Sequence, residues 1–105
     1  MHSIEEINSQ ELAQWLQQEE TIRLIDVRSE SEVARGTIPN SEHLPLHLIP
    51  VKANDLKSPE KFVLFCHSGA RSAQACQFLK SQGHDNVFNL RGGILAWHQA
   101  GQPIN

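Results

Sequence analysis

The sequence predicts a protein of the α/β class with a parallel sheet. Segments of β-branched and apolar residues alternate with segments whose apolar residues recur at three- and four-residue steps, a pattern typical of parallel strands covered by helices. The chain has 105 residues, of which 39% are hydrophobic and 20% are charged. This size and composition predict one folded domain over 1–105, without repeats, linkers or low-complexity segments.

The first part of the chain predicts a helix, a strand and a short capped helix. Ser9 is a candidate N-cap for a helix over 10–18, because apolar residues follow it at helical spacing. Residues 21–27 are β-branched and largely apolar, as in a buried strand. Ser29 and Glu32 have the spacing of a capping box, in which a hydroxyl and a carboxylate satisfy the free amides of a helix start. Glu32 is therefore interpreted as a helix cap.

The rest of the chain predicts further strands and helices separated by turn residues. Glycine, proline and asparagine interrupt residues 36–50, where they allow at most a short strand and a helical turn. The predicted elements after Gly36 are a short strand near 43–44, a strand over 61–65, a helix that begins within 66–72 and stops at Gly83, a strand over 87–90, a turn at 92–93 and a helix over 94–100.

The loop after the strand at 61–65 is the candidate functional site. Sites of parallel α/β proteins lie outside the carboxyl ends of the strands, and here the loop reads Cys66-His67-Ser68-Gly69-Ala70-Arg71-Ser72. Its backbone amides lie at a helix start and could converge on a thiolate at Cys66. No Asp or Glu occurs between Phe62 and Leu79, so Arg71 is expected to be the only formal charge there. These surroundings lower the pKa of a cysteine and attract an anion.

The two cysteines are interpreted differently. The alternative for Cys66 is an inert buried thiol, but a strand-end cysteine that opens a loop of Ser, Gly and Arg meets the conditions for reactivity together. Cys76 lies in the middle of the predicted helix, on the face of Leu79, so we expect a core residue rather than a resolving thiol. Two cysteines do not make a disulfide framework, and a reducing cytoplasm is the expected location.

Other polar residues near the same sheet edge are given structural roles. Asp26 and Arg28 lie at the end of the strand predicted over 21–27, where an ion pair or hydrogen-bonded clamp is favoured over a substrate contact at the rim. Whether Arg28 or Arg91 contacts a substrate is left open by the sequence. Trp15 and Trp97 are expected to fill the core.

Several classes of partner are disfavoured. The net charge is −3 and there is no basic stretch, which argues against nucleic acid. The longest apolar run, 62–66, is far short of the ~20 residues that span a bilayer, and the two acids within 1–6 do not fit a secretory signal. His43 and His47 have the spacing of metal ligands, but Pro45 breaks a helix that could align them, so no metal is expected.

Four motifs together resemble the single-domain rhodanese (thiosulfate sulfurtransferase-like) family. They are Ile25-Asp26-Val27-Arg28 with Glu32, Gly36-Thr37-Ile38-Pro39, Cys66-His67-Ser68-Gly69-Ala70-Arg71-Ser72, and Asn89-Leu90-Arg91-Gly92-Gly93-Ile94 with Ala96-Trp97. They stand in the family's order and cover nearly the whole chain. The resemblance implies a three-layer rhodanese-like fold, with a central parallel five-stranded sheet flanked by helices, and a catalytic Cys66 that carries sulfur as a persulfide.

The resemblance also implies the reaction and its partners. A small anionic sulfur donor such as thiosulfate would bind through Arg71, with His67 and Ser68 at the rim and the backbone of Gly69, Ala70 and Ser72 around the sulfur. A thiol, a protein or cyanide would then accept that sulfur in a double displacement. No cofactor is required, and the protein is expected to be a monomer.

Two departures from related patterns bear on the chemistry. The family often has Gly-His-Ile-Pro-Gly-Ala where this chain has Gly36-Thr37-Ile38-Pro39-Asn40-Ser41, so no histidine is available at that place. Cysteine phosphatases and arsenate reductases use Cys-x5-Arg, whereas this loop is Cys-x4-Arg, a tighter loop that suits a single sulfur better than a phosphate. A phosphatase or arsenate reductase and a catalytically silent binding module are the alternative functions.

Overall fold

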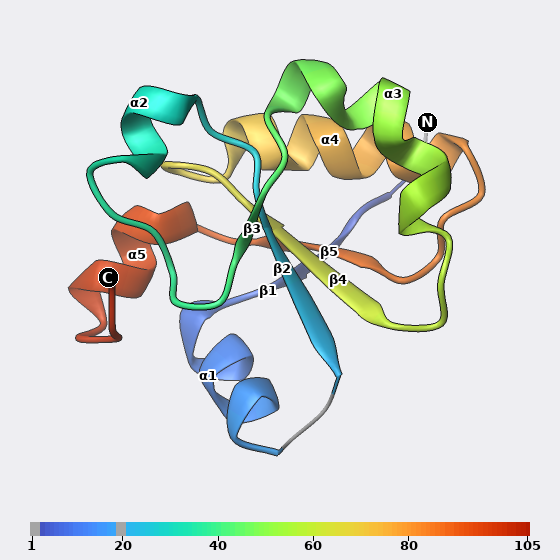
Figure 1. Cartoon of the computed structure of the whole chain (residues 1–105). Coiled ribbons are helices and arrows are strands. Elements are labelled where there is room, and N and C mark those ends of the chain that lie inside the picture. Colours follow the sequence, from blue (N-terminus) through green and yellow to red (C-terminus); the bar gives the residue numbers. More distant parts are fainter. Residues whose placement is uncertain (1–2, 19–20) are drawn as a thin grey trace.

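The computed structural model, which describes residues 3–18 and 21–105, contains a five-stranded parallel sheet (Figure 1). The strand order is β1-β5-β4-β2-β3, and every pairing in it is parallel. The predicted α/β class and the five-stranded sheet are thereby confirmed. The strands are β1 (Glu5–Ile7), β2 (Ile22–Asp26), β3 (Glu42–His43), β4 (Lys61–Phe65) and β5 (Val87–Leu90).

Helices cover both faces of this sheet. Figure 1 shows α3 and α4 on one side of it and α1 and α5 on the other. The α-helices are α1 (Ser9–Gln17), α2 (Glu30–Val33), α3 (Ile49–Lys52), α4 (Ala70–Ser81) and α5 (Gly93–Gln99), and the 3₁₀ helices are η1 (Leu46–Leu48) and η2 (Ala53–Leu56). The result is the three-layer arrangement that the resemblance implied.

Alternation along the central strands divides the core between the two layers. Leu64 of β4 packs with Ile49 and Leu79 on the α3 and α4 side, whereas its neighbour Val63 packs with Leu12 and Trp97 on the α1 and α5 side. Successive strand residues point to opposite faces, so a strand buried on both faces is apolar at nearly every position. Trp97 lies in the core as expected, and Trp15 is half-buried with its ring edge against Phe88.

The structure differs from the sequence-based expectations at the N-terminal end. The strand β1 was not predicted, because it has three residues and two of them are exposed glutamates. Its strand geometry comes from pairing with β5, where Ile7 lies opposite Leu90. The N-cap of α1 is Asn8 rather than Ser9, since the Asn8 side chain accepts from the Glu11 amide at 2.8 Å and completes a capping box.

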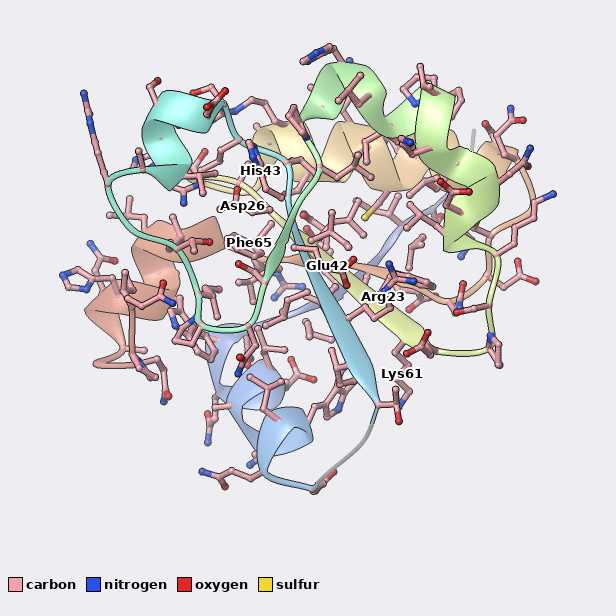
Figure 2. All side chains as sticks on the ribbon, in the orientation of Figure 1. Arg23, Asp26, Glu42, His43, Lys61 and Phe65 are labelled. Carbon is pink, nitrogen blue, oxygen red and sulfur yellow. The ribbon has the colours of Figure 1, made fainter. Side chains whose placement is uncertain are left out.

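The edge strand β3 is fixed by side chains as well as by backbone pairing. Arg23 of β2 donates to Glu42 of β3 through two contacts, at 2.8 Å from Nε and 2.7 Å from Nη2 (Figure 2). The strand occupies 42–43 instead of the expected 43–44, and the helical turn expected after it extends through η1, α3 and η2. The stretch from β3 to η2 therefore borders the sheet on the side of its edge strand β3.

Among the residues described, no helix has the length and apolar character needed to cross a membrane. Met1 and His2 belong to the N-terminal segment that did not fit a secretory signal, and they lie outside the described residues. The expectation that this segment is not a secretory signal therefore stays a prediction.

Candidate active site

Cys66 lies at the carboxyl end of the middle strand of the sheet. The strand β4 ends at Phe65, and α4 begins four residues after Cys66, at Ala70. The thiol is buried, with a relative exposure of 1%. The side chains of His67 and Ser68 are exposed at the outer side of this loop, as is that of Ala70.

Hydrogen-bond donors surround the sulfur of Cys66. The Gly69 amide lies 3.1 Å from Sγ and the Ser72 hydroxyl oxygen lies 3.5 Å from it. Burial raises the pKa of the Cys66 thiol, but the Ser72 hydroxyl and the amides of Ser72, Gly69 and Ser68 outweigh burial and leave the pKa below its ordinary value. This is the direction that the sequence predicts, and the donors to the thiolate are mainly uncharged dipoles of the loop.

This arrangement predicts the pH dependence of Cys66 alkylation. The rate of reaction with iodoacetamide should rise with a midpoint below the ~8.5 of a free thiol, read at the Cys66 peptide by mass spectrometry. Ser72→Ala should move the midpoint upward, because one donor to the thiolate is lost. A wild-type midpoint at or above the free value would contradict the electrostatic account of this loop.

Arg71 is the only formal charge between Phe62 and Leu79, as expected, but α2 brings a carboxylate to it from outside that segment. Its Nη1 and Nη2 atoms lie 2.7 and 2.8 Å from the two carboxylate oxygens of Glu32, which comes from α2. The hydrogen bonds to Arg71 hold the pKa of the Glu32 carboxyl well below its usual range and raise the pKa of Arg71. The paired side chains remain 39% and 30% exposed, so an anion can still approach the guanidinium.

Glu32 keeps the capping role that its spacing predicted. Its carboxylate accepts from the Ser29 amide at 3.1 Å, and its own amide donates to the Ser29 hydroxyl at 3.3 Å. The capping box of α2 is thereby confirmed. One carboxylate thus both starts α2 and orients Arg71, which joins the short helix to the loop of Cys66.

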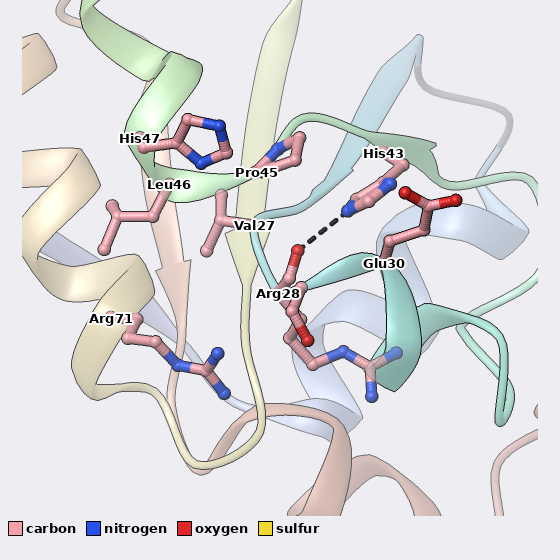
Figure 3. A pocket seen from close by; sticks show the side chains of 9 residues that line it. Val27, Arg28, Glu30, His43, Pro45, Leu46, His47 and Arg71 are labelled. Atoms are coloured by element: carbon pink, nitrogen blue, oxygen red, sulfur yellow. Dashed lines mark hydrogen bonds between the residues drawn. The ribbon is translucent and has the colours of Figure 1, made fainter.

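A pocket of about 590 Å³ opens beside Arg71 (Figure 3). His43 and His47, which the sequence suggested only as weak metal-ligand candidates, lie on its wall, and His43 Nε2 is 2.7 Å from the Arg28 carbonyl oxygen. His43 ends β3 and His47 follows it in η1, and this position at the end of a strand is the signal that could have identified them. The lining residues are Val27, Arg28, Ser29, Glu30, His43, Pro45, Leu46, His47 and Arg71.

Asp26 and Arg28 form a buried ion pair at the wall of this pocket, which Arg28 lines. Arg28 Nη2 lies 2.8 Å from Asp26 Oδ2, and the two side chains are 7% and 1% exposed. Arg28 also donates to the Gly36 carbonyl at 2.7 Å, and the Thr37 hydroxyl donates to Asp26 at 2.7 Å. The guanidinium of Arg28 is thus committed to the fold, in agreement with the structural interpretation. Arg91 is mostly exposed, with its Nε 3.4 Å from Glu6.

The first turn of α5 holds the loop of Cys66 through backbone hydrogen bonds. The Ile94 amide donates to the Cys66 carbonyl at 2.9 Å and the Leu95 amide donates to the His67 carbonyl at 3.1 Å. Gly93 has a φ of +61°, and a Cβ added there would lie 2.5 Å from both of those carbonyl oxygens. Only glycine combines this left-handed backbone with so close an approach.

Gly93→Ala is therefore expected to destabilise the protein and to displace the loop of Cys66. The left-handed conformation alone costs about 1 to 3 kcal/mol for a residue with a side chain, and the overlap with two carbonyl oxygens adds to that cost. Thermal unfolding should show the loss. Gly83→Ala is the matched control, since it also has positive φ but no atom within 4 Å of its added Cβ. Equal destabilisation by the two variants, with unchanged Cys66 alkylation, would contradict a supporting role for Gly93.

The fold and this site define a class, an α/β protein with a buried, hydrogen-bonded cysteine at the carboxyl end of its central strand. The model of the rhodanese-like domain matches residues 8–100. The chain belongs to the rhodanese-like family.

Two relatives and one solved structure match this chain over nearly their whole length. It is 46% identical over 101 residues to a sulfurtransferase of Allochromatium vinosum, covering 96% of this chain and 94% of that protein. It is 38% identical to a putative sulfurtransferase of Bacillus subtilis, covering 97% and 98%. A crystal structure of a rhodanese-related protein from Thermoplasma volcanium is 31% identical, with a TM-score of 0.87 and coverage of 96% and 97%. These similarities support a transferase activity for this chain.

Proposed function

We propose that this protein transfers sulfane sulfur from a small anionic donor such as thiosulfate to a thiol, protein or cyanide acceptor. The observation that carries the proposal is the set of donors around Cys66 Sγ, with the Gly69 amide at 3.1 Å and the Ser72 hydroxyl at 3.5 Å. Such a set stabilises a negative sulfur in a place from which water is largely excluded. Relatives named sulfurtransferases support the same reaction.

The reaction is a double displacement on Cys66. The thiolate attacks the outer sulfur of thiosulfate, a new S–S bond forms, and the bond between the two donor sulfurs breaks so that sulfite leaves with its electron pair. Cys66 then carries a persulfide anion, which the loop amides stabilise. An acceptor thiolate or cyanide attacks the outer sulfur, and the thiolate of Cys66 is regenerated. The net charge is the same on both sides of each step.

Arg71 is proposed to bind the anionic end of the donor. It faces the pocket of about 590 Å³ and its pair with Glu32 keeps the guanidinium oriented. A planar guanidinium grips two oxygens of a sulfonate-like group, as it grips a carboxylate. The donor must approach a guanidinium whose Nη1 and Nη2 atoms already donate to Glu32.

The two alternatives are less well supported by the residues present. A cysteine phosphatase also needs a carboxylic acid to protonate its leaving group, and Glu32, the carboxylate nearest the loop arginine, is bound to Arg71 through both oxygens. A silent binding module does not require a buried cysteine surrounded by donors.

Intact-mass measurement tests the proposal against both alternatives. After incubation with thiosulfate, the protein should gain the mass of one sulfur atom, and cyanide should remove it with release of thiocyanate. Cys66→Ser should gain nothing. If the wild-type protein gains no sulfur, and instead hydrolyses an aryl phosphate or reduces arsenate, the sulfurtransferase proposal fails. Absence of all these activities would favour the binding module.

A further inference from the structure

A hydrogen-bond chain extends from the donors around Cys66 to residues that the proposed reaction does not use. It runs from Cys66 to Ser72 of α4, to Asn89 of β5 and to Glu6 of β1. Ser72 is fully buried and Asn89 is 1% exposed. Because both side chains are buried, their hydrogen bonds are made within the protein rather than to solvent.

The orientation of the Asn89 amide follows from its partners. Its Nδ2 atom lies 2.9 Å from the Glu6 carboxylate and 3.2 Å from the Gly69 carbonyl oxygen. Both partners accept hydrogen bonds and donate none, so the NH2 group must face them. The Oδ1 atom therefore faces Ser72, at 2.5 Å from its hydroxyl oxygen.

The Ser72 hydroxyl consequently has two acceptors and one hydrogen. Asn89 Oδ1 lies 2.5 Å from the hydroxyl oxygen, whereas Cys66 Sγ lies 3.5 Å from it. A hydroxyl donates a single hydrogen bond, and an amide oxygen at the shorter distance is the stronger acceptor for it when the sulfur is uncharged. A negative charge on Sγ makes the sulfur a stronger acceptor and so a competitor for that hydrogen.

We propose that Asn89 is a positioning residue for sulfur transfer, which competes with Cys66 for the single hydrogen of Ser72. In the thiolate, the charge on Sγ attracts the Ser72 hydrogen, and the hydrogen bond from Ser72 to Asn89 is lost. The loss of that bond offsets part of the free energy by which Ser72 stabilises the thiolate. In the persulfide, the charge lies on the outer sulfur, and the hydrogen can return to Asn89. Asn89 thereby favours the persulfide over the thiolate and leaves the thiolate more nucleophilic than an unopposed Ser72 would. This inference rests on the proposed role of Cys66.

The charged and titratable groups around Cys66 are not themselves replaced when Asn89 is changed. They are Arg71 and His67 on the loop, Glu32 on α2, and Glu6 with Arg91 at the far end of the chain of hydrogen bonds. A change in Asn89 can therefore be assigned through a double-mutant cycle with Ser72.

Asn89→Leu should release Ser72 to donate to Cys66 alone. The midpoint of Cys66 alkylation by iodoacetamide should fall by about 0.5 to 1 pH unit, the equivalent of one hydrogen bond. At a pH well above both midpoints, the alkylation rate should fall about two- to threefold, because a less basic thiolate is a weaker nucleophile. In the Ser72→Ala background, Asn89→Leu should leave the midpoint unchanged. Asn89→Ala, which introduces no new atoms, should reproduce the direction if the leucine variant does not fold.

Two results would overturn the proposal. An equal downward shift in the Ser72→Ala background would mean that Asn89 acts through the Gly69 carbonyl and the shape of the loop. An upward shift in the wild-type background would mean that Asn89 assists the thiolate instead of competing with it. Both readouts use alkylation alone. A wild-type protein that takes no sulfur from thiosulfate therefore overturns the proposed function without affecting the result of the cycle.

Discussion

Cys66→Ser is expected to abolish sulfur transfer from thiosulfate to cyanide. A serine hydroxyl at this place has the donors of the loop around it, but it is not ionised at neutral pH and cannot hold a second sulfur atom. The initial rate of thiocyanate formation should fall to the level without protein. The fold should be retained, because the side chains are close in size and Ser68, Gly69 and Ser72 can hydrogen-bond the new oxygen.

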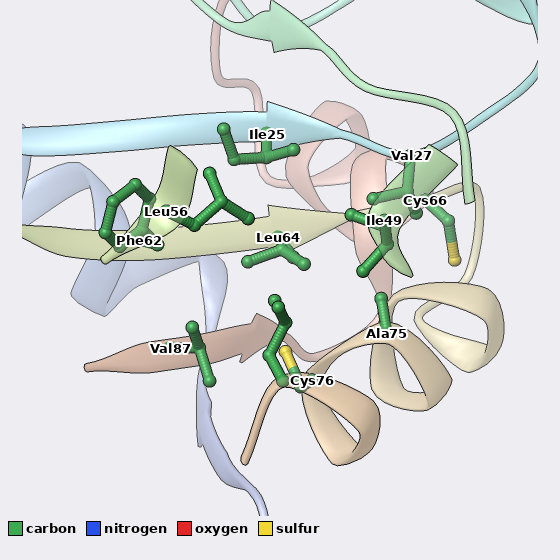
Figure 4. Close-up of a cluster of buried hydrophobic side chains, with 11 residues drawn as sticks. Ile25, Val27, Ile49, Leu56, Phe62, Leu64, Cys66, Ala75, Cys76 and Val87 are labelled. Carbon is green, nitrogen blue, oxygen red and sulfur yellow. The ribbon is translucent and has the colours of Figure 1, made fainter. Parts of the chain in front are cut away.

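Cys76→Ala is the matched control for this loss. Cys76 points into the apolar cluster between β4 and α4 (Figure 4), and burial, followed by the charge of Glu6, raises the pKa of its thiol to about 12. A thiol with that pKa is almost entirely protonated at neutral pH. The variant should keep most of the activity and lose some stability. A comparable loss of activity in both variants would indicate a relay between two cysteines and would contradict the core role of Cys76.

Arg71→Ala is expected to raise the KM for thiosulfate more than it lowers kcat. The guanidinium is proposed to bind the charged end of the donor and takes no part in making or breaking bonds, so its loss removes binding common to the ground and transition states. The expected cost is about 1.5 to 3 kcal/mol, or roughly ten- to a hundredfold in kcat/KM. Steady-state kinetics with thiosulfate measure both parameters. Arg71→Lys should recover only part of the loss, because an ammonium lacks the planar fork.

Glu32→Gln tests whether Arg71 binds the donor or only holds the loop in shape. Glutamine serves in a capping box as glutamate does, so the hydrogen bonds with Ser29 can persist while the negative charge beside Arg71 is removed. The KM for thiosulfate should then fall. If Arg71→Ala leaves this KM unchanged, or affects charged and neutral donors alike, Arg71 shapes the loop and its role in donor binding is wrong.

Patterns between near neighbours in the chain were enough to predict most elements and the position of the candidate site. The apolar run of β4, followed at once by Cys66 and a helix start, placed the thiol at the carboxyl end of a buried strand. The capping box of Ser29 and Glu32 followed from a spacing of three residues. Such features depend on local backbone geometry and on side chains within one helical turn, so they can be predicted from the sequence alone.

The tertiary structure alone decided which distant side chains meet at the site. Arg71 and Glu32 are 39 positions apart, and Asn89 and Glu6 are 83 positions apart. Neither pair has a local signal, because each forms only when crossover connections bring parallel strands into register and their ends to one edge. The three residues of β1 became a strand for the same reason, since their backbone partner is β5. The sequence by itself thus determined that a cysteine would lie in a loop of donors, whereas packing of separate elements determined which groups hold its arginine and share the hydrogen of its serine.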